Sequence, residues 1–129
     1  MYIDYEKRCD ISVLIGKTIT EVRNLSQGSD SVVFECEDGA EYTMYHSQDC
    51  CESVSISDVE GDVSDLVGSA VVVAESVDSS EQPAPAGDYV DSYTWTFYRI
   101  ATAKGFVVIR WLGESNGYYS ESVDFAKTK

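Results

Sequence analysis

Positive charge is scarce in this sequence of 129 residues. Nine lysines and arginines stand against 23 aspartates and glutamates, which gives a formal net charge of -14. No lysine or arginine occurs between Asn24 and Tyr98, a stretch of 75 residues that holds 16 of the acids. Because nothing in this stretch can neutralise phosphates, we expect no direct binding to nucleic acid.

Long apolar runs are also missing. Residues 1 to 4 lack the basic start and the apolar core of a signal peptide. No apolar run approaches the roughly 20 residues that span a bilayer. We therefore expect a cytoplasmic protein with no membrane contact. In a cytosol the four cysteines are expected to be reduced thiols.

The chain nevertheless has enough apolar material to fold. Hydrophobic residues make up 43% of it, with nine tyrosines and two tryptophans, which excludes a disordered protein. A chain of this length buries about two-thirds of its unfolded surface as one domain. We therefore predict a single domain over residues 1 to 129.

The local pattern predicts two short helices and about eight strands. Asp10 and Gly16 have the residue types that cap the two ends of a helix, and Asp62 and Gly68 repeat them. Alternating apolar residues predict the strands. These lie at 17–25, 31–37, 40–46, 53–57, 70–77, 93–102, 106–112 and about 121–125. The segment 70–77 is almost wholly apolar, which predicts burial on both faces.

Three matches in the same order indicate an internal repeat. The segment 10–16 matches 62–68 at an offset of 52, and Gly39 matches Gly105 at an offset of 66. Glu52-Ser53-Val54 matches Glu121-Ser122-Val123 at an offset of 69. We predict repeat one at about 9–59 and repeat two at about 61–126, with a mobile acidic loop inserted at 78–91. The predicted fold is α+β, mostly β, in two pseudo-symmetric helix-plus-four-strand repeats.

The loop after the third strand combines the one histidine with two adjacent cysteines. Imidazole and thiolate are the ligands that zinc prefers, so the weak metal candidates are His46, Cys50, Cys51 and Cys36. A Cys–His nucleophile pair is the enzymatic alternative, but the acidic neighbours raise the pKa of a thiol. The spacing fits no standard zinc finger, so we expect a structural loop with no metal, no cofactor and no catalytic residue.

Residues 113–117 follow the seventh strand as 47–51 follow the third, so pseudo-symmetry can bring the loops 46–53 and 113–121 into one surface. The aromatic residues at 93, 95 and 97 should lie mostly in the core. An aromatic-lined pocket between the two loops can hold a small ligand. The tentative binding residues are His46, Gln48, Asp49, Glu52, Glu114, Asn116, Tyr118, Tyr119 and Trp111.

Three segments of the chain resemble a known family. They are His-Ser-Gln-Asp-Cys-Cys-Glu-Ser-Val at 46–54, Ser-Tyr-Thr-Trp-Thr-Phe-Tyr at 92–98 and Gly-Glu-Ser-Asn-Gly-Tyr-Tyr-Ser-Glu at 113–121. On these motifs the chain resembles a family of small bacteriophage proteins known only as a domain of unknown function. The resemblance covers nearly the full length. It implies a phage protein in the bacterial cytosol, and it implies no catalytic residue.

These observations lead to one expected function and two alternatives. We expect a non-enzymatic acidic binding protein that engages a basic host or defence protein and can mimic the charge of a nucleic acid. The first alternative is a sponge-like protein that holds a small molecule between the loops 46–53 and 113–121. The second is a zinc-binding structural module. A charge that serves only solubility is the simplest explanation of the acidity.

Overall fold

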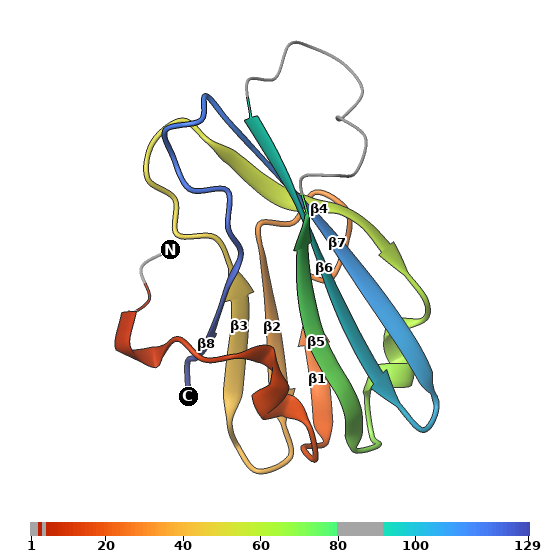
Figure 1. The fold of residues 1–129 in the computed structure, drawn as a ribbon. Coiled ribbons are helices and arrows are strands. Elements are labelled where there is room, and N and C mark those ends of the chain that lie inside the picture. The colour runs from red at the N-terminus through yellow and green to blue at the C-terminus, as the bar shows by residue number, and fades with distance from the viewer. Residues whose placement is uncertain (1–2, 4, 80–91) are drawn as a thin grey trace.

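The computed structural model describes residue 3 and residues 5–79 and 92–129, and it shows eight strands in two antiparallel sheets (Figure 1). The first sheet has the order β1-β2-β3-β8, and the second has the order β4-β7-β6-β5. The strands are β1 (Ile19–Arg23), β2 (Ser31–Cys36), β3 (Glu41–Tyr45), β4 (Ser53–Glu60), β5 (Val71–Ser79), β6 (Ser92–Thr102), β7 (Gly105–Ser115) and β8 (Asp124–Lys127). The prediction of a mostly β fold with eight strands is confirmed.

One core joins the two sheets. Phe34 and Met44 of the first sheet belong to the same buried cluster as Ile100 and Trp111 of the second, and all four are fully buried. The Trp111 indole nitrogen donates to the Met44 sulfur at 3.2 Å, so a side chain of one sheet bonds directly to the other. Each sheet turns the apolar half of its alternating pattern toward this shared interior.

The predicted helices are short 3₁₀ turns, η2 (Ile11–Leu14) and η3 (Val63–Leu66), beside a further turn η1 (Tyr5–Lys7). The predicted caps are present: the carboxylates of Asp10 and Asp62 accept from backbone N–H groups two residues on, at 2.9 and 3.0 Å. Within the described part of the chain there is no α-helix, and no helix is long or apolar enough to cross a membrane. Of the predicted α+β class, the described residues therefore show the β-strands and only short 3₁₀ turns in place of α-helices.

The two halves of the chain build their sheets in the same way and exchange their last strands. β1, β2 and β3 lie in the first sheet in chain order, as β5, β6 and β7 do in the second. The fourth strand of each half then crosses over: β4 pairs with β7, and β8 pairs with β3. Two helix-plus-four-strand units are thus present, although neither keeps its fourth strand. The bounds of the two repeats and the single-domain assignment stay predictions.

Backbone hydrogen bonds between the halves follow the same offset of 52 residues. Gly16 N–H donates to the Val71 carbonyl at 2.8 Å, and Gly68 N–H donates to the Ile19 carbonyl at 2.9 Å. The donors are equivalent in the predicted repeat, and so are the acceptors. Both glycines have positive φ, at 88° and 87°, which L side chains rarely adopt. This junction therefore explains why each capped turn ends in glycine.

The prediction that residues 70–77 are buried on both faces is wrong. Val72 and Val77 of β5 are 58% and 56% exposed, because β5 is the edge strand of a sheet that only the core side covers. Residues 80–91 of the predicted acidic loop lie outside the described residues. Asp78, which we placed in that loop, belongs to β5.

Candidate functional site

The predicted histidine loop is the link that carries the chain from one sheet to the other. We call residues 46–52, between β3 and β4, the first crossover loop. His46 and Glu52 stand at its two ends and are both buried, at 8% and 5% exposure. The ring nitrogen Nε2 of His46 lies 2.7 Å from Oε2 of Glu52, and Nδ1 lies 2.7 Å from the carbonyl oxygen of Ser122. Both ring nitrogens therefore lie within hydrogen-bond distance of oxygens of the protein.

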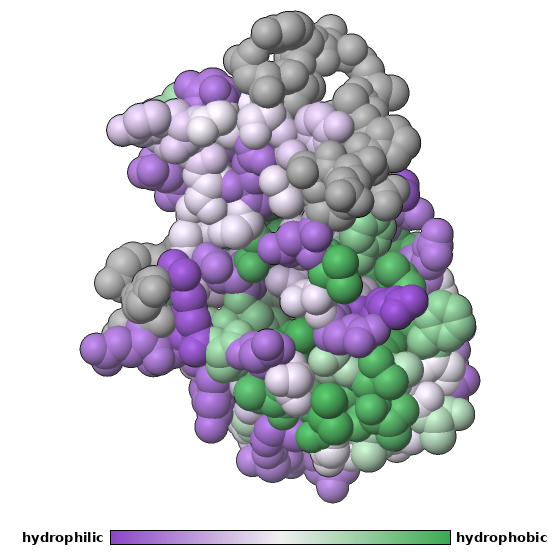
Figure 2. Space-filling view, in the orientation of Figure 1, coloured by the Kyte–Doolittle hydropathy of each residue, from purple (hydrophilic) through white to green (hydrophobic). Residues whose placement is uncertain are grey.

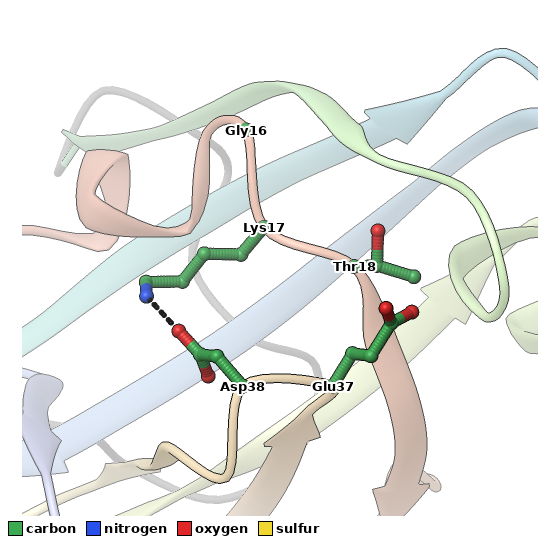
Figure 3. Close-up of a pocket in the computed structure, with 5 residues that line it drawn as sticks. All are labelled: Gly16, Lys17, Thr18, Glu37 and Asp38. Carbon is green, nitrogen blue, oxygen red and sulfur yellow. Dashed lines mark hydrogen bonds and ion pairs between the residues drawn. The ribbon is translucent and has the colours of Figure 1, made fainter.

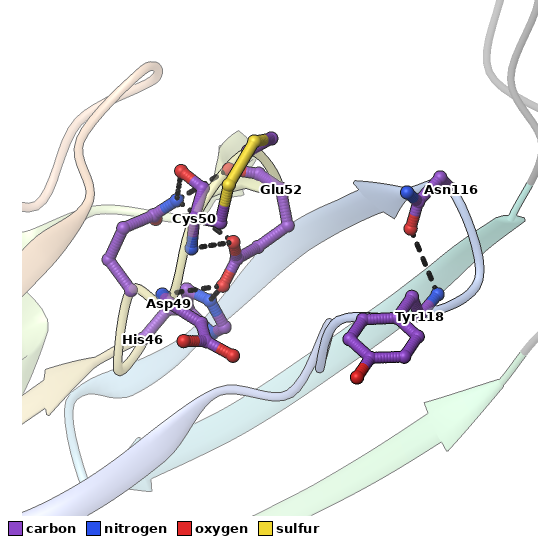
Figure 4. The surroundings of a disulfide bond; sticks show 8 residues. His46, Asp49, Cys50, Glu52, Asn116 and Tyr118 are labelled. Atoms are coloured by element: carbon purple, nitrogen blue, oxygen red, sulfur yellow. Dashed lines mark hydrogen bonds and ion pairs between the residues drawn. A yellow bond between two sulfur atoms is a disulfide. The ribbon is translucent and has the colours of Figure 1, made fainter.

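The Glu52 carboxylate organises this loop. The backbone N–H groups of Asp49 and Cys50 each donate to it at 2.9 Å, and the Gln48 amide donates at 3.2 Å (Figure 4). Burial opposes ionisation of Glu52, but the hydrogen bonds from His46 and from the two N–H groups outweigh it and lower its pKa to about 2. A buried carboxylate with this many donors is a structural anchor.

The expectation that every cysteine is a free thiol is wrong for two of them. Cys50 and Cys51 form a disulfide between adjacent residues, and both are exposed at the tip of the first crossover loop (Figure 4). We expected reduced thiols because we expected a cytosolic location. That expectation depends on cellular redox conditions and takes no account of how close the two sulfurs lie. In this oxidised form neither sulfur is a thiolate that could act as a nucleophile.

The metal candidates are not gathered in one place. Cys36 ends β2 beside Ile19, whereas the opposite end of β2, at Ser31, lies beside Tyr45 and so near His46. Both His46 nitrogens already contact oxygens of the protein. Among the residues that the structure describes, no three histidine, cysteine or acidic side chains group so as to hold a metal ion. The geometry gives the zinc alternative no support.

The second crossover loop, residues 116–123, returns the chain from β7 to β8. Its Glu121 accepts from the Thr94 hydroxyl at 2.7 Å and from the Ser115 hydroxyl. Gly113 lies against Glu121 so closely that a Cβ there would be 2.5 Å from the Glu121 carbonyl oxygen. Glu121 thus anchors the second crossover loop as Glu52 anchors the first, which explains the matching Glu-Ser-Val sequences.

The two crossover loops meet, as pseudo-symmetry suggested, but they do not enclose the predicted aromatic residues. His46 reaches Ser122, and Ser53 at the start of β4 pairs with Glu114 near the end of β7. Trp111, however, is fully buried in the core, and Tyr118 is 84% exposed.

Four other predicted binding residues contact residues of their own loop. Asn116 accepts from the Tyr118 N–H at 3.0 Å and caps its own turn (Figure 4). Tyr119 packs edge-on against the Tyr118 ring. Gln48 and Asp49 are exposed, although the Gln48 side-chain amide and the Asp49 backbone N–H both donate hydrogen bonds to Glu52. A binding role for these nine residues stays a prediction.

A polar hollow lies at the opposite end of the first sheet. It has a volume of about 380 Å³ and is lined by Gly16, Lys17, Thr18, Glu37 and Asp38 (Figure 3). The Lys17 ammonium donates to Asp38 at 2.6 Å, and this hydrogen bond raises the pKa of Lys17 and lowers that of Asp38. This ion pair neutralises the lysine and one of the two acids of the hollow.

An apolar surface that was not predicted from the sequence covers one side of the second sheet, and we call it the outer face of the second sheet. Strand pairing places its side chains on the side of the sheet away from the core. The members are Val73, Glu75, Val77, Trp95, Phe97, Arg99, Ala101, Phe106, Val108, Arg110, Leu112, Asp58 and Glu60. Trp95 and Phe97, which we expected in the core, lie on this side of the sheet, although Trp95 is only 9% exposed. The signal was present in the alternation of Trp95, Phe97 and Arg99, because an arginine on the same side as two aromatic residues indicates an exposed face.

A family model described as a domain of unknown function, DUF7448, matches residues 12–125. This match spans most of the sequence, so the chain belongs to that family. It includes the second capped turn, both crossover loops and all of the outer face of the second sheet, and it begins within the first capped turn. No curated protein and no solved structure matches the chain.

Proposed function

We propose that this member of the DUF7448 family is a non-enzymatic acidic binding protein, used by a bacteriophage in the bacterial cytosol to engage a basic host or defence protein. The observation that carries the proposal is the distribution of the acidic residues. Of the 13 central acids that the structure describes, only Glu52 is buried. The other 12 reach the surface and form an extended negative field.

Some of these acids are neutralised, and the partners come from outside the central stretch. Arg23 contacts Glu35 and Glu41 at 2.9 and 3.0 Å, and Arg99 contacts Glu75 at 2.9 Å. Acids along β4 and η3, by contrast, have no basic neighbour in sequence. Among the described residues, Asp58, Glu60 and Asp62 make no ion pair.

An excess of this size costs stability through self-repulsion, and solubility alone requires less of it. A basic partner relieves the repulsion on binding, and such a partner explains why the chain carries this excess of acidic residues. Such a surface also mimics the charge of a nucleic acid and can occupy a positively charged groove. Long-range attraction speeds the encounter, and salt weakens it by screening.

The test is capture from a bacterial lysate followed by direct binding. The tagged protein should retain a basic protein at low salt and release it at high salt, and the purified partner should bind the purified chain with the same salt dependence. An unrelated protein of matched size and net charge controls for nonspecific ion exchange. Equal retention by that control would contradict the proposal.

Mass spectrometry of small molecules released from the purified chain distinguishes the proposal from the first alternative, a sponge-like protein that holds a small molecule. A stoichiometric metabolite, with no basic protein partner, would favour a ligand held between the crossover loops and would overturn the proposal.

A further inference from the structure

The two sheets differ sharply in what they expose. On the first sheet, Arg23 contacts Glu21, Glu35 and Glu41 in one cluster, so the outward side of that sheet is charged. On the second sheet, Phe106 is 63% exposed and Val77 is 56% exposed. Figure 2 shows hydrophobic residues gathered along the course that β5 takes in Figure 1. Phe106 lies in one row with Ala101 and Val73 across three neighbouring strands, and Val73 is 38% exposed. Adjacent exposed apolar side chains on a charged protein mark an interaction surface.

The outer face of the second sheet is also hollowed. One hollow of about 390 Å³ is lined by Val73, Ala101, Phe106 and Val108 together with the Glu75–Arg99 pair. A smaller one, of about 70 Å³, is lined by Asp58, Glu60, Phe97, Val108 and Arg110. Val108 lines both hollows. The apolar hollow therefore lies next to one that carries two carboxylates and the Arg110 guanidinium.

On this face the positive side chains have partners within the protein, whereas two of the negative side chains have none among the described residues. The Arg99 guanidinium lies 2.9 Å from Glu75, and the Arg110 guanidinium lies 5.1 Å above the Trp95 ring. Both arginines are therefore engaged within the face itself. Asp58 and Glu60, which pair across the strands with Arg110 and Val108, form no ion pair with any described residue. The charge that remains for a partner is negative.

We infer that the outer face of the second sheet is the docking site for a basic segment of a partner protein. The segment seats apolar side chains in the hollow at Phe106 and Val108, and it pairs a flanking lysine or arginine with Asp58 or Glu60. A second copy of the chain is disfavoured, because each copy carries a formal charge of -14. The inference rests on the proposed function and names the surface that would perform it.

The probe is an immobilised library of peptides in which net charge and apolar content vary independently. Wild-type protein should select peptides that combine lysine or arginine with leucine or aromatic residues. Amide chemical-shift changes on adding a selected peptide should map to β5, β6 and β7. Changes confined to the crossover loops would overturn the inference.

Four variants identify the surface. Phe106→Ser should weaken binding of a selected peptide about tenfold, as truncation of an anchoring aromatic does. Glu60→Gln should weaken it about threefold and flatten its salt dependence. Tyr118→Ser removes a still more exposed aromatic from the second crossover loop, and Glu37→Gln removes an acid from the hairpin between β2 and β3. Both controls should bind as wild type does.

The outcomes distinguish a failure of the proposed docking surface from a failure of the proposed function. If basic peptides bind in a salt-sensitive way and Phe106→Ser binds as tightly as wild type, the surface is wrong and the proposed function survives. If wild type selects no basic peptide, both fall. Sedimentation tests the remaining occupant: a wild-type dimer that Phe106→Ser dissociates would assign the face to a second copy and overturn the inference. Unchanged melting curves confirm that each variant is folded.

Discussion

Thr18 and Ala70 pair in an isolated antiparallel bridge, and they occupy equivalent places in the two halves of the chain. The bridge lies between the hydrogen bonds that Gly16 and Gly68 donate across the junction of the sheets. An approximate twofold relation therefore passes through this pair. Its neighbours should respond to equivalent substitutions in equivalent ways.

Gly16→Ala and Gly68→Ala should destabilise the protein equally, by about 1 kcal/mol each. Neither new methyl group meets a close neighbour, so the cost is that of placing alanine at positive φ. Chemical denaturation of the two variants measures it. A difference of severalfold between them would contradict the equivalence of the two turns.

Glu52→Gln should lower the free energy of unfolding by about 2 kcal/mol, because hydrogen bonds to the buried carboxylate lose their charge-assisted strength. Glu121→Gln is the matched control in the second crossover loop. It should cost less, because Glu121 is only half-buried and accepts from hydroxyl groups. Equal losses would contradict the special role of Glu52.

Acid should destabilise the protein through the same residue. The pKa of Glu52 is about 2 in the fold, below the ordinary carboxyl value of 4.5. Its ionised form therefore contributes stability above pH 4.5, and this contribution is lost as the pH falls toward 2. Melting temperatures measured across this interval should fall less steeply for Glu52→Gln than for wild type. Parallel curves would assign the acid sensitivity to other carboxylates.

Gly113→Ala should cost about 2 kcal/mol, because its methyl group would collide with the Glu121 backbone. Gly39→Ala is the contrasting control: its methyl group has open space, and its φ of 89° supplies the only penalty. Denaturation should rank Gly113→Ala as the more damaging change. The reverse order would mean that the second crossover loop moves aside.

Reduction of the Cys50–Cys51 disulfide should change the unfolding free energy by about 1 kcal/mol or less, because a bond between adjacent residues restrains the unfolded chain little. Alkylation of the unfolded, unreduced protein should modify only Cys9 and Cys36. The double variant Cys50→Ser/Cys51→Ser should unfold identically with and without reductant. Labelling of all four cysteines before reduction would contradict the disulfide.

Much of the fold was predictable because its signals are local. Asp10 and Gly16 predicted a capped turn, and alternating residues predicted the strands, since caps and alternation depend only on near neighbours. The exchange of β4 and β8 was not predictable. The same Glu-Ser-Val sequence stands at the start of β4 and just before β8, so it does not distinguish the two strands. Choosing a partner for each requires knowledge of the assembled core.

The candidate site was predicted in part for the same reason. His46 and Glu52 are six residues apart, and their contact follows from the shortness of one loop. The exposure of Val72 and Val77 could not be inferred, because a run of valines suits a covered strand and an uncovered one equally. Whether another layer covers a sheet is decided by the whole chain.

The exchange of the fourth strands also sets the order in which this protein can fold during synthesis. β3 ends at Tyr45, but its second neighbour, β8, begins only at Asp124. Until the ribosome has made that segment, β3 has an unpaired edge and the first sheet lacks a strand. Exposed edges favour misassembly in nascent chains. The N-terminal half is therefore expected to remain incomplete until β8 has left the ribosome, and to close its sheet only then.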